Sequence, residues 1–135
     1  MKIILDTNVL VAAFITRGVC SELLDHCIRH RELITSEFIL GEFQQHLRHK
    51  FKYNTVEIEK AIKLLSLKVV LVTPVVLSGK ICRDADDDAI LGTAVAGEGD
   101  CIITGDKDLL VLKHFGSIDI ISPSEFSNYE APKLK

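Results

Sequence analysis

The sequence predicts a three-layer α/β/α fold, in which a central, mainly parallel sheet lies between helices. Short apolar segments alternate along the chain with longer segments whose apolar residues recur at helical spacing. The chain has 135 residues, 47% of them hydrophobic and 26% charged, a composition that suits a single packed domain. We therefore expect one domain over residues 1–128, followed by a loosely held tail at 129–135.

The elements follow from these patterns and from the residues that start and stop them. Apolar segments predict strands at residues 2–5, 32–35, 68–72, 101–104 and 118–121. Helical spacing predicts helices at 8–15, 21–30, 37–51, 55–67 and 88–96, and a short one from 123. Three helix starts carry N-cap signals, which are Ser36, Asn54 with Glu57, and Ser122 with Glu125.

Composition excludes several classes of protein. The formal net charge is −3, which argues against binding to nucleic acid by bulk charge alone. No apolar run reaches the ~18–20 residues of a membrane span. Asp6 and Asn8 interrupt the apolar N-terminus, so we expect mature protein there and a cytoplasmic location. The four cysteines form no C-x-x-C pair, which favours small buried side chains over a zinc site.

Three acidic residues occupy positions that are unusual for surface charges. Asp6 and Asp106 each follow a predicted strand, and the carboxyl ends of parallel strands form the edge at which such sheets bind ligands. Glu42 lies on the apolar stripe of its helix, one turn after Phe38. A carboxylate there is costly unless it is paired, for which His46 is a candidate, or bound to a metal.

A cluster of acids, "RDADDDAI", precedes the helix at 88–96. Acids in a first helical turn favour the helix dipole, and this explanation suffices for Asp84 and Asp86. Asp87 and Asp88 each share a helical stripe with Leu91, so either can face the sheet. Helical phase alone leaves the choice between these two open.

If one sheet edge gathers these acids, electrostatics requires a counterion. Two carboxylates ~4 Å apart repel by ~4 kcal/mol at an effective dielectric constant near 20. A pocket lined by oxygen ligands suits Mg²⁺ or Mn²⁺. Such ions polarise phosphoryl oxygens and activate water, which is the chemistry of phosphodiester hydrolysis.

Taken in order, these segments resemble the PIN-domain family of metal-dependent ribonucleases. The matching segments are "DTNVLVAA", "GEF", "RDADDDAILGTAVA" and "CIITGDKDLL", and the similarity runs over roughly residues 1–126. The resemblance implies a compact α/β/α domain whose four metal-binding acids are Asp6, Glu42, Asp88 and Asp106. Asp87 and Asp84 compete with Asp88 for the third position. Asn8 and Thr104 match positions that support the site by hydrogen bonds, and Asp108 is expected beside it.

The same resemblance implies function and partners. It implies Mg²⁺- or Mn²⁺-dependent cleavage of RNA, and the subgroup is that of toxin components in bacterial toxin–antitoxin pairs. A cognate antitoxin and a homodimer are therefore expected. An RNA backbone needs positive groups near the acidic site, for which Lys107, Arg48 and Lys50 are candidates, although cations near a helix C-terminus also favour the dipole.

Two other functions compete with the nuclease. A phosphoacceptor receiver module also has this length and an acidic Mg²⁺ pocket. It requires two adjacent acids after the first strand, where this chain has "DTN". A non-catalytic domain whose acids only bind an ion or a partner is the other alternative.

Overall fold

A computed structural model describes residues 1–134 and contains a six-stranded sheet. The strands are β1 (Lys2–Leu5), β2 (Glu32–Ser36), β3 (Val69–Val72), β4 (Cys101–Ile103), β5 (His114–Phe115) and β6 (Ile118–Ile121). Their order across the sheet is β3-β2-β1-β4-β6-β5, and only β5 runs antiparallel to its neighbour. The predicted fold class is confirmed, and the five predicted strands are present. The short edge strand β5 was not predicted.

Seven α-helices connect the strands. They are α1 (Thr7–Ile15), α2 (Val19–His30), α3 (Glu37–His49), α4 (Thr55–Ser66), α5 (Ala85–Ala96), α6 (Lys107–Leu110) and α7 (Phe126–Glu130). The predicted caps at Ser36 and Asn54 are confirmed, and Asn54 forms a capping box with Glu57. Ser122 precedes the turn at Pro123–Glu125 as predicted, and its N–H and hydroxyl both donate to Glu125. Two 3₁₀ turns, Pro123–Glu125 and Ala131–Leu134, flank α7. Helix α6 was not predicted, because four residues carry too little periodicity to be recognised.

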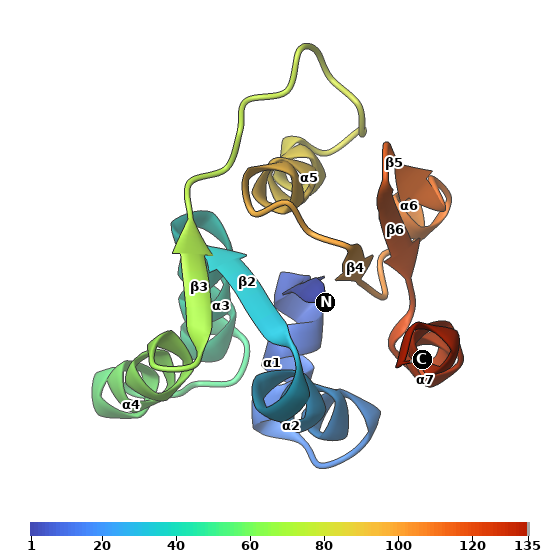
Figure 1. Ribbon diagram of the computed structural model, residues 1–135. Helices are drawn as coiled ribbons and strands as arrows, with labels where there is room; N and C mark the ends of the chain where they lie inside the picture. The colour runs from blue at the N-terminus through green and yellow to red at the C-terminus, as the bar shows by residue number, and fades with distance from the viewer. Residues whose placement is uncertain (135) are drawn as a thin grey trace.

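The helices cover the two faces of the sheet unequally. Ile4 and Ile34 point toward the end of α5, where Gly97 and Gly99 leave room for their side chains. On the other face, Leu5 and Leu33 lie with residues of α1 and α4 around one small void. In Figure 1, α5 and the loop before it lie at the top, and α1, α2 and α4 at the bottom. Strands β1 and β4 are parallel neighbours at the centre of the sheet, so their carboxyl ends lie side by side.

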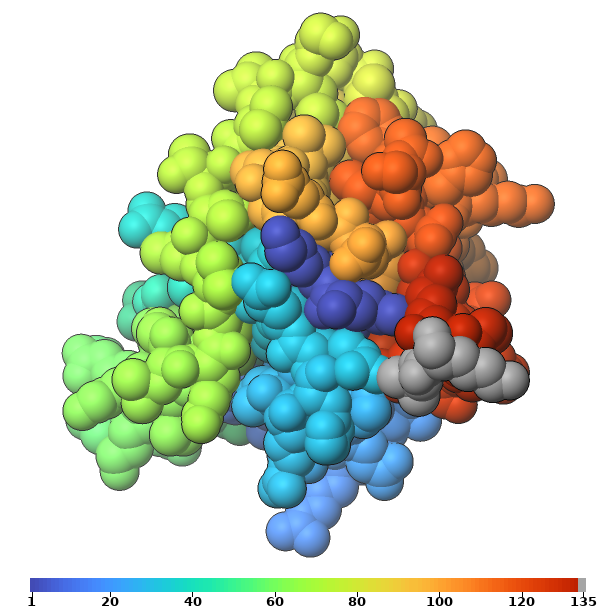
Figure 2. Space-filling model, viewed as in Figure 1, coloured from blue at the N-terminus to red at the C-terminus, as the bar shows by residue number. Residues whose placement is uncertain are grey.

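The loop that joins β3 to α5, residues 73–84, packs along α5. The N–H of Val75 donates to the carbonyl oxygen of Gly92, 3.0 Å away. A Cβ atom at Gly92 would overlap the backbone carbonyl of Val75, so the close contact requires glycine there. Figure 2 shows this loop, in yellow-green, covering the top of the molecule. The loop is therefore held against the middle of α5.

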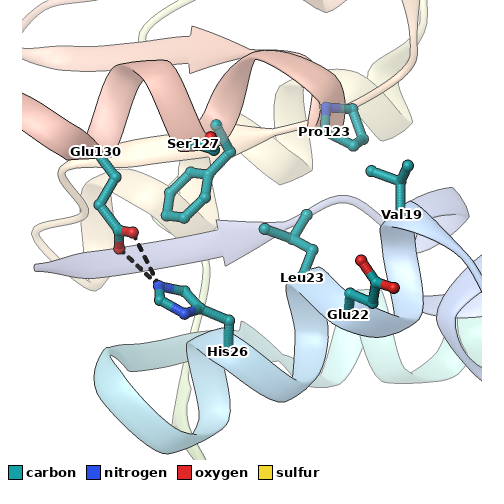
Figure 3. A pocket seen from close by; sticks show the side chains of 8 residues that line it. Val19, Glu22, Leu23, His26, Pro123, Ser127 and Glu130 are labelled. Carbon is teal, nitrogen blue, oxygen red and sulfur yellow. Dashed lines mark hydrogen bonds and ion pairs between the residues drawn. The ribbon is translucent and has the colours of Figure 1, made fainter.

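The chain remains packed beyond residue 128, where the predicted domain boundary lies. The hydroxyl of Tyr129 donates to Asp119, 2.8 Å away. The buried carboxylate of Glu130 accepts from Arg31 and from the ring of His26, whose Nε2 is 2.9 Å from both carboxylate oxygens. Figure 3 shows His26 and Glu130 facing one another from α2 and α7. Of the predicted tail, Lys135 lies outside the described residues.

Two further expectations concern cysteines and membranes. Cys27, Cys82 and Cys101 are buried, and burial raises the pKa of each thiol to about 12. These three match the prediction of small buried side chains, whereas Cys20 is only half-buried. Within residues 1–134, no single helix is long and apolar enough to cross a membrane. Only α1 and α2 taken together, across a bend of 105°, reach that length and composition.

Candidate functional site

Acidic side chains line a pocket of about 210 Å³ at the carboxyl ends of the central strands. Four separate segments of the chain contribute to it: the β1–α1 junction, α3, the first turn of α5 and the β4–α6 junction. The lining residues are Asp6, Thr7, Asn8, Glu42, His46, Asp84, Asp86, Asp87, Ile90 and Asp106. Three of the four acids predicted for the site, Asp6, Glu42 and Asp106, are among them.

Asp6 is the most constrained acid of the pocket. It follows β1 directly and is the N-cap of α1, because one carboxylate oxygen accepts from the N–H of Thr7 at 2.7 Å. The other oxygen accepts from the hydroxyl of Thr104 at 2.7 Å. Burial raises the pKa of Asp6, the hydrogen bond from Thr104 opposes the rise, and the charge of Asp106 adds to it. The carboxylate is therefore held in one orientation, and the nearby His46 opposes the rise in its pKa.

Asp106 repeats this arrangement after β4. Its side chain caps α6 by accepting from the N–H of Asp108 at 2.8 Å. Its own N–H donates to the hydroxyl of Thr104, 3.0 Å away. The buried Thr104 side chain thus bonds to both acid-bearing segments, which ties the ends of β1 and β4 together. Thr104 is placed where the sequence predicted a supporting residue.

Glu42 reaches the pocket from α3. Ile39, Phe43 and Leu47 of the same helix are fully buried, and this packing turns the half-buried Glu42 toward α1. The hydroxyl of Thr7 donates to its carboxylate at 2.8 Å. Desolvation raises the pKa of Glu42, and the nearby charge of Asp86 raises it further. The sequence did not single out Thr7, although its place directly after Asp6 was a usable signal.

The structure places the two candidates for the third acid differently. Asp88, the predicted ligand, turns away from the pocket and accepts from the N–H groups of Ile81 and Cys82 at 3.1 and 2.8 Å. Desolvation raises the pKa of Asp88, but the hydrogen bonds from Ile81 and Cys82 together outweigh it, so the pKa is lowered. Asp87 lines the pocket instead and is 7% exposed. The loop before α5 supplies the two N–H donors, and so determines which acid faces inward.

Asp87 has the most perturbed titration of the pocket acids. Among the described residues, no hydrogen bond reaches its carboxylate. Burial, followed by the charges of Asp106, Asp84 and Asp6, raises its pKa to about 7. An unpaired buried carboxylate facing other carboxylates is a strong electrostatic conflict.

Asp84 and Asp86 also border the pocket. Asp84 is the N-cap of α5 and accepts from the N–H of Asp86 at 2.9 Å, as expected of an acid that starts a helix. The helix dipole was expected to account for Asp86 as well, but Asp86 lies close enough to Glu42 to raise the pKa of that group. Both side chains are exposed, so they form the rim of the pocket.

Asp108 lies next to the pocket. Its carboxylate and those of Asp87 and Asp106 have oxygens within 4.8 Å of one another, so the three could share an ion. Asp108 also accepts from Arg83 at 2.8 and 3.0 Å. The guanidinium of Arg83 is largely exposed, so the pair is open to solvent.

The predicted RNA contacts lie outside the pocket lining. Lys107, Arg48 and Lys50 are exposed, and none of them forms an ion pair in the part of the chain that the structure describes. Lys107 follows Asp106 directly, whereas Arg48 and Lys50 belong to the end of α3, about two turns beyond Glu42. Asn8 is exposed at the mouth of the pocket.

The donor set fits a divalent cation. Asp6, Glu42, Asp87 and Asp106 offer only carboxylate oxygens, which are the ligands that Mg²⁺ and Mn²⁺ accept. Among the described residues, no lysine or arginine enters the pocket to neutralise them. Burial raises the pKa values of Asp6, Glu42 and Asp87, and the charges of neighbouring carboxylates raise them further.

The fold and the pocket together define an α/β protein with an acidic candidate metal centre at the carboxyl edge of its sheet. A model of the PIN-domain family matches residues 2–108. The chain belongs to the PIN-domain family. A comparison with curated proteins found no match.

Several solved structures share the fold of this chain. The structure is similar to VapBC-1 from nontypeable Haemophilus influenzae, with a TM-score of 0.65, 17% identity, and coverage of 92% of this chain and 99% of the other. It is similar to VapBC2 from Rickettsia felis, solved bound to a DNA fragment from their promoter, with a TM-score of 0.63, 13% identity, and coverage of 90% and 98%. It is also similar to FitAcB from Neisseria gonorrhoeae, with a TM-score of 0.57, 15% identity, and coverage of 90% and 98%.

Proposed function

We propose that the protein is a divalent-metal-dependent endoribonuclease that hydrolyses RNA phosphodiester bonds. The observation that carries this proposal is the convergence of Asp6, Glu42, Asp87 and Asp106, from four separate segments, on one pocket. Membership of the PIN-domain family supports the nuclease over a phosphoacceptor receiver. We assign Asp87 as the third acid of the site, in place of Asp88.

Asp6, Glu42, Asp87 and Asp106 would hold Mg²⁺ or Mn²⁺, which supplies Lewis-acid activation of the phosphodiester and of water. The protein's own groups then perform three tasks. Thr7 and Thr104 fix Glu42 and Asp6 in place through their hydroxyl groups. A pocket carboxylate accepts the proton that the attacking water releases. Lys107, which directly follows Asp106, would contact the RNA backbone.

We further propose that the protein is the cytoplasmic toxin of a toxin–antitoxin pair. The sequence resembles the PIN subgroup of toxin components, and two of the similar structures are VapBC assemblies. A cognate antitoxin would then be its partner, and a homodimer is the expected state of the toxin. Co-purification with the product of a neighbouring small gene tests the first expectation, and light scattering tests the second.

Substitution by asparagine tests the nuclease directly. Asn keeps an oxygen that can cap a helix, so Asp6→Asn and Asp106→Asn should remove the charge and leave α1 and α6 intact. Changes outside the ligand shell already cost 10–100-fold in metal affinity or activity, so we expect each variant to lose at least about 100-fold in Mg²⁺- or Mn²⁺-dependent RNA cleavage.

The matched control is Asp88→Asn, which changes an adjacent acid whose carboxylate faces away from the pocket. It should retain cleavage at temperatures where it is folded. Cleavage that survives in both Asp6→Asn and Asp106→Asn would refute the acidic pocket as the active site. Cleavage that continues in EDTA would refute the proposed dependence on a divalent metal. Metal binding without turnover on varied RNAs would favour the non-catalytic alternative.

A further inference from the structure

His46 is the one side chain in the pocket lining with a nitrogen base. It lies on α3 one turn after Glu42, and the two side chains line the same pocket as Asp6, Asp87 and Asp106. Its ring is half-buried, whereas the neighbouring His49 is exposed. The packing of Phe43 and Leu47, which turns Glu42 inward, gives His46 the same direction because residues four apart share a helix face.

The ring of His46 has no partner in the part of the chain that the structure describes. We expected it to pair with Glu42, but Glu42 accepts from Thr7 instead, and no ion pair joins the two. His26 provides the contrast, because its ring is bound by Glu130 and serves to hold α7 against α2. A half-buried imidazole that faces carboxylates without a hydrogen bond has a nitrogen lone pair available for a ligand.

We propose that His46 supplies a nitrogen ligand to the divalent cation of the acidic pocket, and that the site therefore prefers Mn²⁺ to Mg²⁺. This inference rests on the proposed function, because it assumes that the pocket holds a divalent cation. Mg²⁺ takes oxygen ligands and keeps several waters. Imidazole nitrogen suits first-row transition metals such as Mn²⁺. The affinity of a mixed nitrogen and oxygen site rises along the first-row series that begins with Mn²⁺. Four carboxylates alone would discriminate less between the two ions.

The test is a spectroscopic measurement on the full chain loaded with less than one equivalent of Mn²⁺. Electron spin echo modulation detects nitrogen bonded to Mn²⁺, and we expect a ¹⁴N coupling in the wild-type protein. The coupling should disappear in His46→Gln, which keeps a polar side chain of similar length. His49→Gln is the matched control on the same helix and should leave the coupling unchanged.

Affinities provide a second readout. His46→Gln should weaken Mn²⁺ binding about tenfold and change Mg²⁺ binding by no more than about twofold. Thermal unfolding without metal checks that the variant is folded. A wild-type protein that binds Mn²⁺ without a ¹⁴N coupling, or a variant that loses both ions equally, would overturn the role of His46.

Failure of the metal site, on which the proposed function depends, gives a different result. In that case the wild-type protein would bind neither ion in the pocket, or Asp6→Asn would bind Mn²⁺ as well as the wild type. The two failures are thus distinguishable in the same titration.

Discussion

Asp87 and Asp88 are adjacent, yet the structure predicts that neutralising them has opposite effects on stability. Asp87→Asn should stabilise the metal-free protein at pH 8, because it removes a buried charge without a hydrogen bond or a cation. Asp88→Asn should destabilise it, because a carboxylate that accepts from two backbone N–H groups becomes an amide with one oxygen. Hydrogen bonds to a charged group suggest a loss of about 1–2 kcal/mol for Asp88→Asn.

The size of the Asp87 effect follows from its titration. The pKa rises from an ordinary value of 3.8 to about 7. At 1.36 kcal/mol per pH unit, this difference is worth roughly 4 kcal/mol. Relaxation of the neighbouring acids reduces this difference. We therefore expect Asp87→Asn to raise the free energy of unfolding by about 2–4 kcal/mol at pH 8.

The stability difference between Asp87→Asn and wild type depends on pH. Between about pH 4 and pH 7, folded Asp87 keeps a proton that the unfolded chain has released, so its contribution to stability falls as the pH rises and is constant above pH 7. The advantage of Asp87→Asn over wild type should therefore be small at pH 5 and largest at pH 8. Groups titrating elsewhere, including the histidines, act in both proteins and largely cancel in the difference.

The assay is urea unfolding in EDTA at pH 5, 6, 7 and 8, for wild type and both variants. In EDTA at pH 8, Asp87→Asn should be more stable than wild type. Saturating Mn²⁺ should make wild type the more stable of the two, since the cation stabilises wild type more than Asp87→Asn. The reasoning is refuted if the difference between Asp87→Asn and wild type does not grow from pH 5 to pH 8. It is also refuted if both asparagine variants change stability in the same direction.

Three further changes probe the supports of the fold and site. Thr104→Val removes the hydroxyl that holds Asp6, so we expect a loss of about 1–3 kcal/mol in urea unfolding and about tenfold weaker Mn²⁺ binding. Glu130→Gln leaves Arg31 without its buried counter-charge and should cost about 3–5 kcal/mol at pH 7. The pKa of Glu130 is lowered from its ordinary value of 4.5 by His26 and Arg31 against the effect of burial, so the difference from wild type should shrink as the pH falls below that value. Gly92→Ala should lower the thermal midpoint by several degrees, roughly the effect of 1–3 kcal/mol of overpacking, while Gly41→Ala, which meets no neighbour, should not.

Much of the fold could be predicted because its signals are local. The apolar strands, the breaks between them and the cap residues Ser36 and Asn54 each depend on a few neighbouring residues. Strand β5 and helix α6 escaped prediction because two and four residues carry no usable period. The attachment of α7 escaped it as well, because the partner of Glu130, Arg31, lies 99 positions away in sequence.

Some residues of the candidate site could likewise be predicted from local patterns, and others could not. Asp6, Glu42 and Asp106 could be placed from strand ends and from a helical stripe. The choice between Asp87 and Asp88 could not, because helical phase allows both and the N–H groups of the preceding loop decide between them. The position of a loop relative to a helix is tertiary information that no local pattern contains. His46 was recognised only as a partner for Glu42, since a free ring nitrogen is visible only in the folded protein.

Asp6 and Asp106 each begin the helix that follows them as well as lining the pocket. Folding therefore selects for these two side chains independently of any chemistry, whereas Asp87 opposes folding in the absence of metal. In a relative that had lost its activity, drift would remove the acid at position 87 early and preserve those at 6 and 106. Retained acids after the first and fourth strands are thus poor markers of a working enzyme, and the acid at position 87 is a good one.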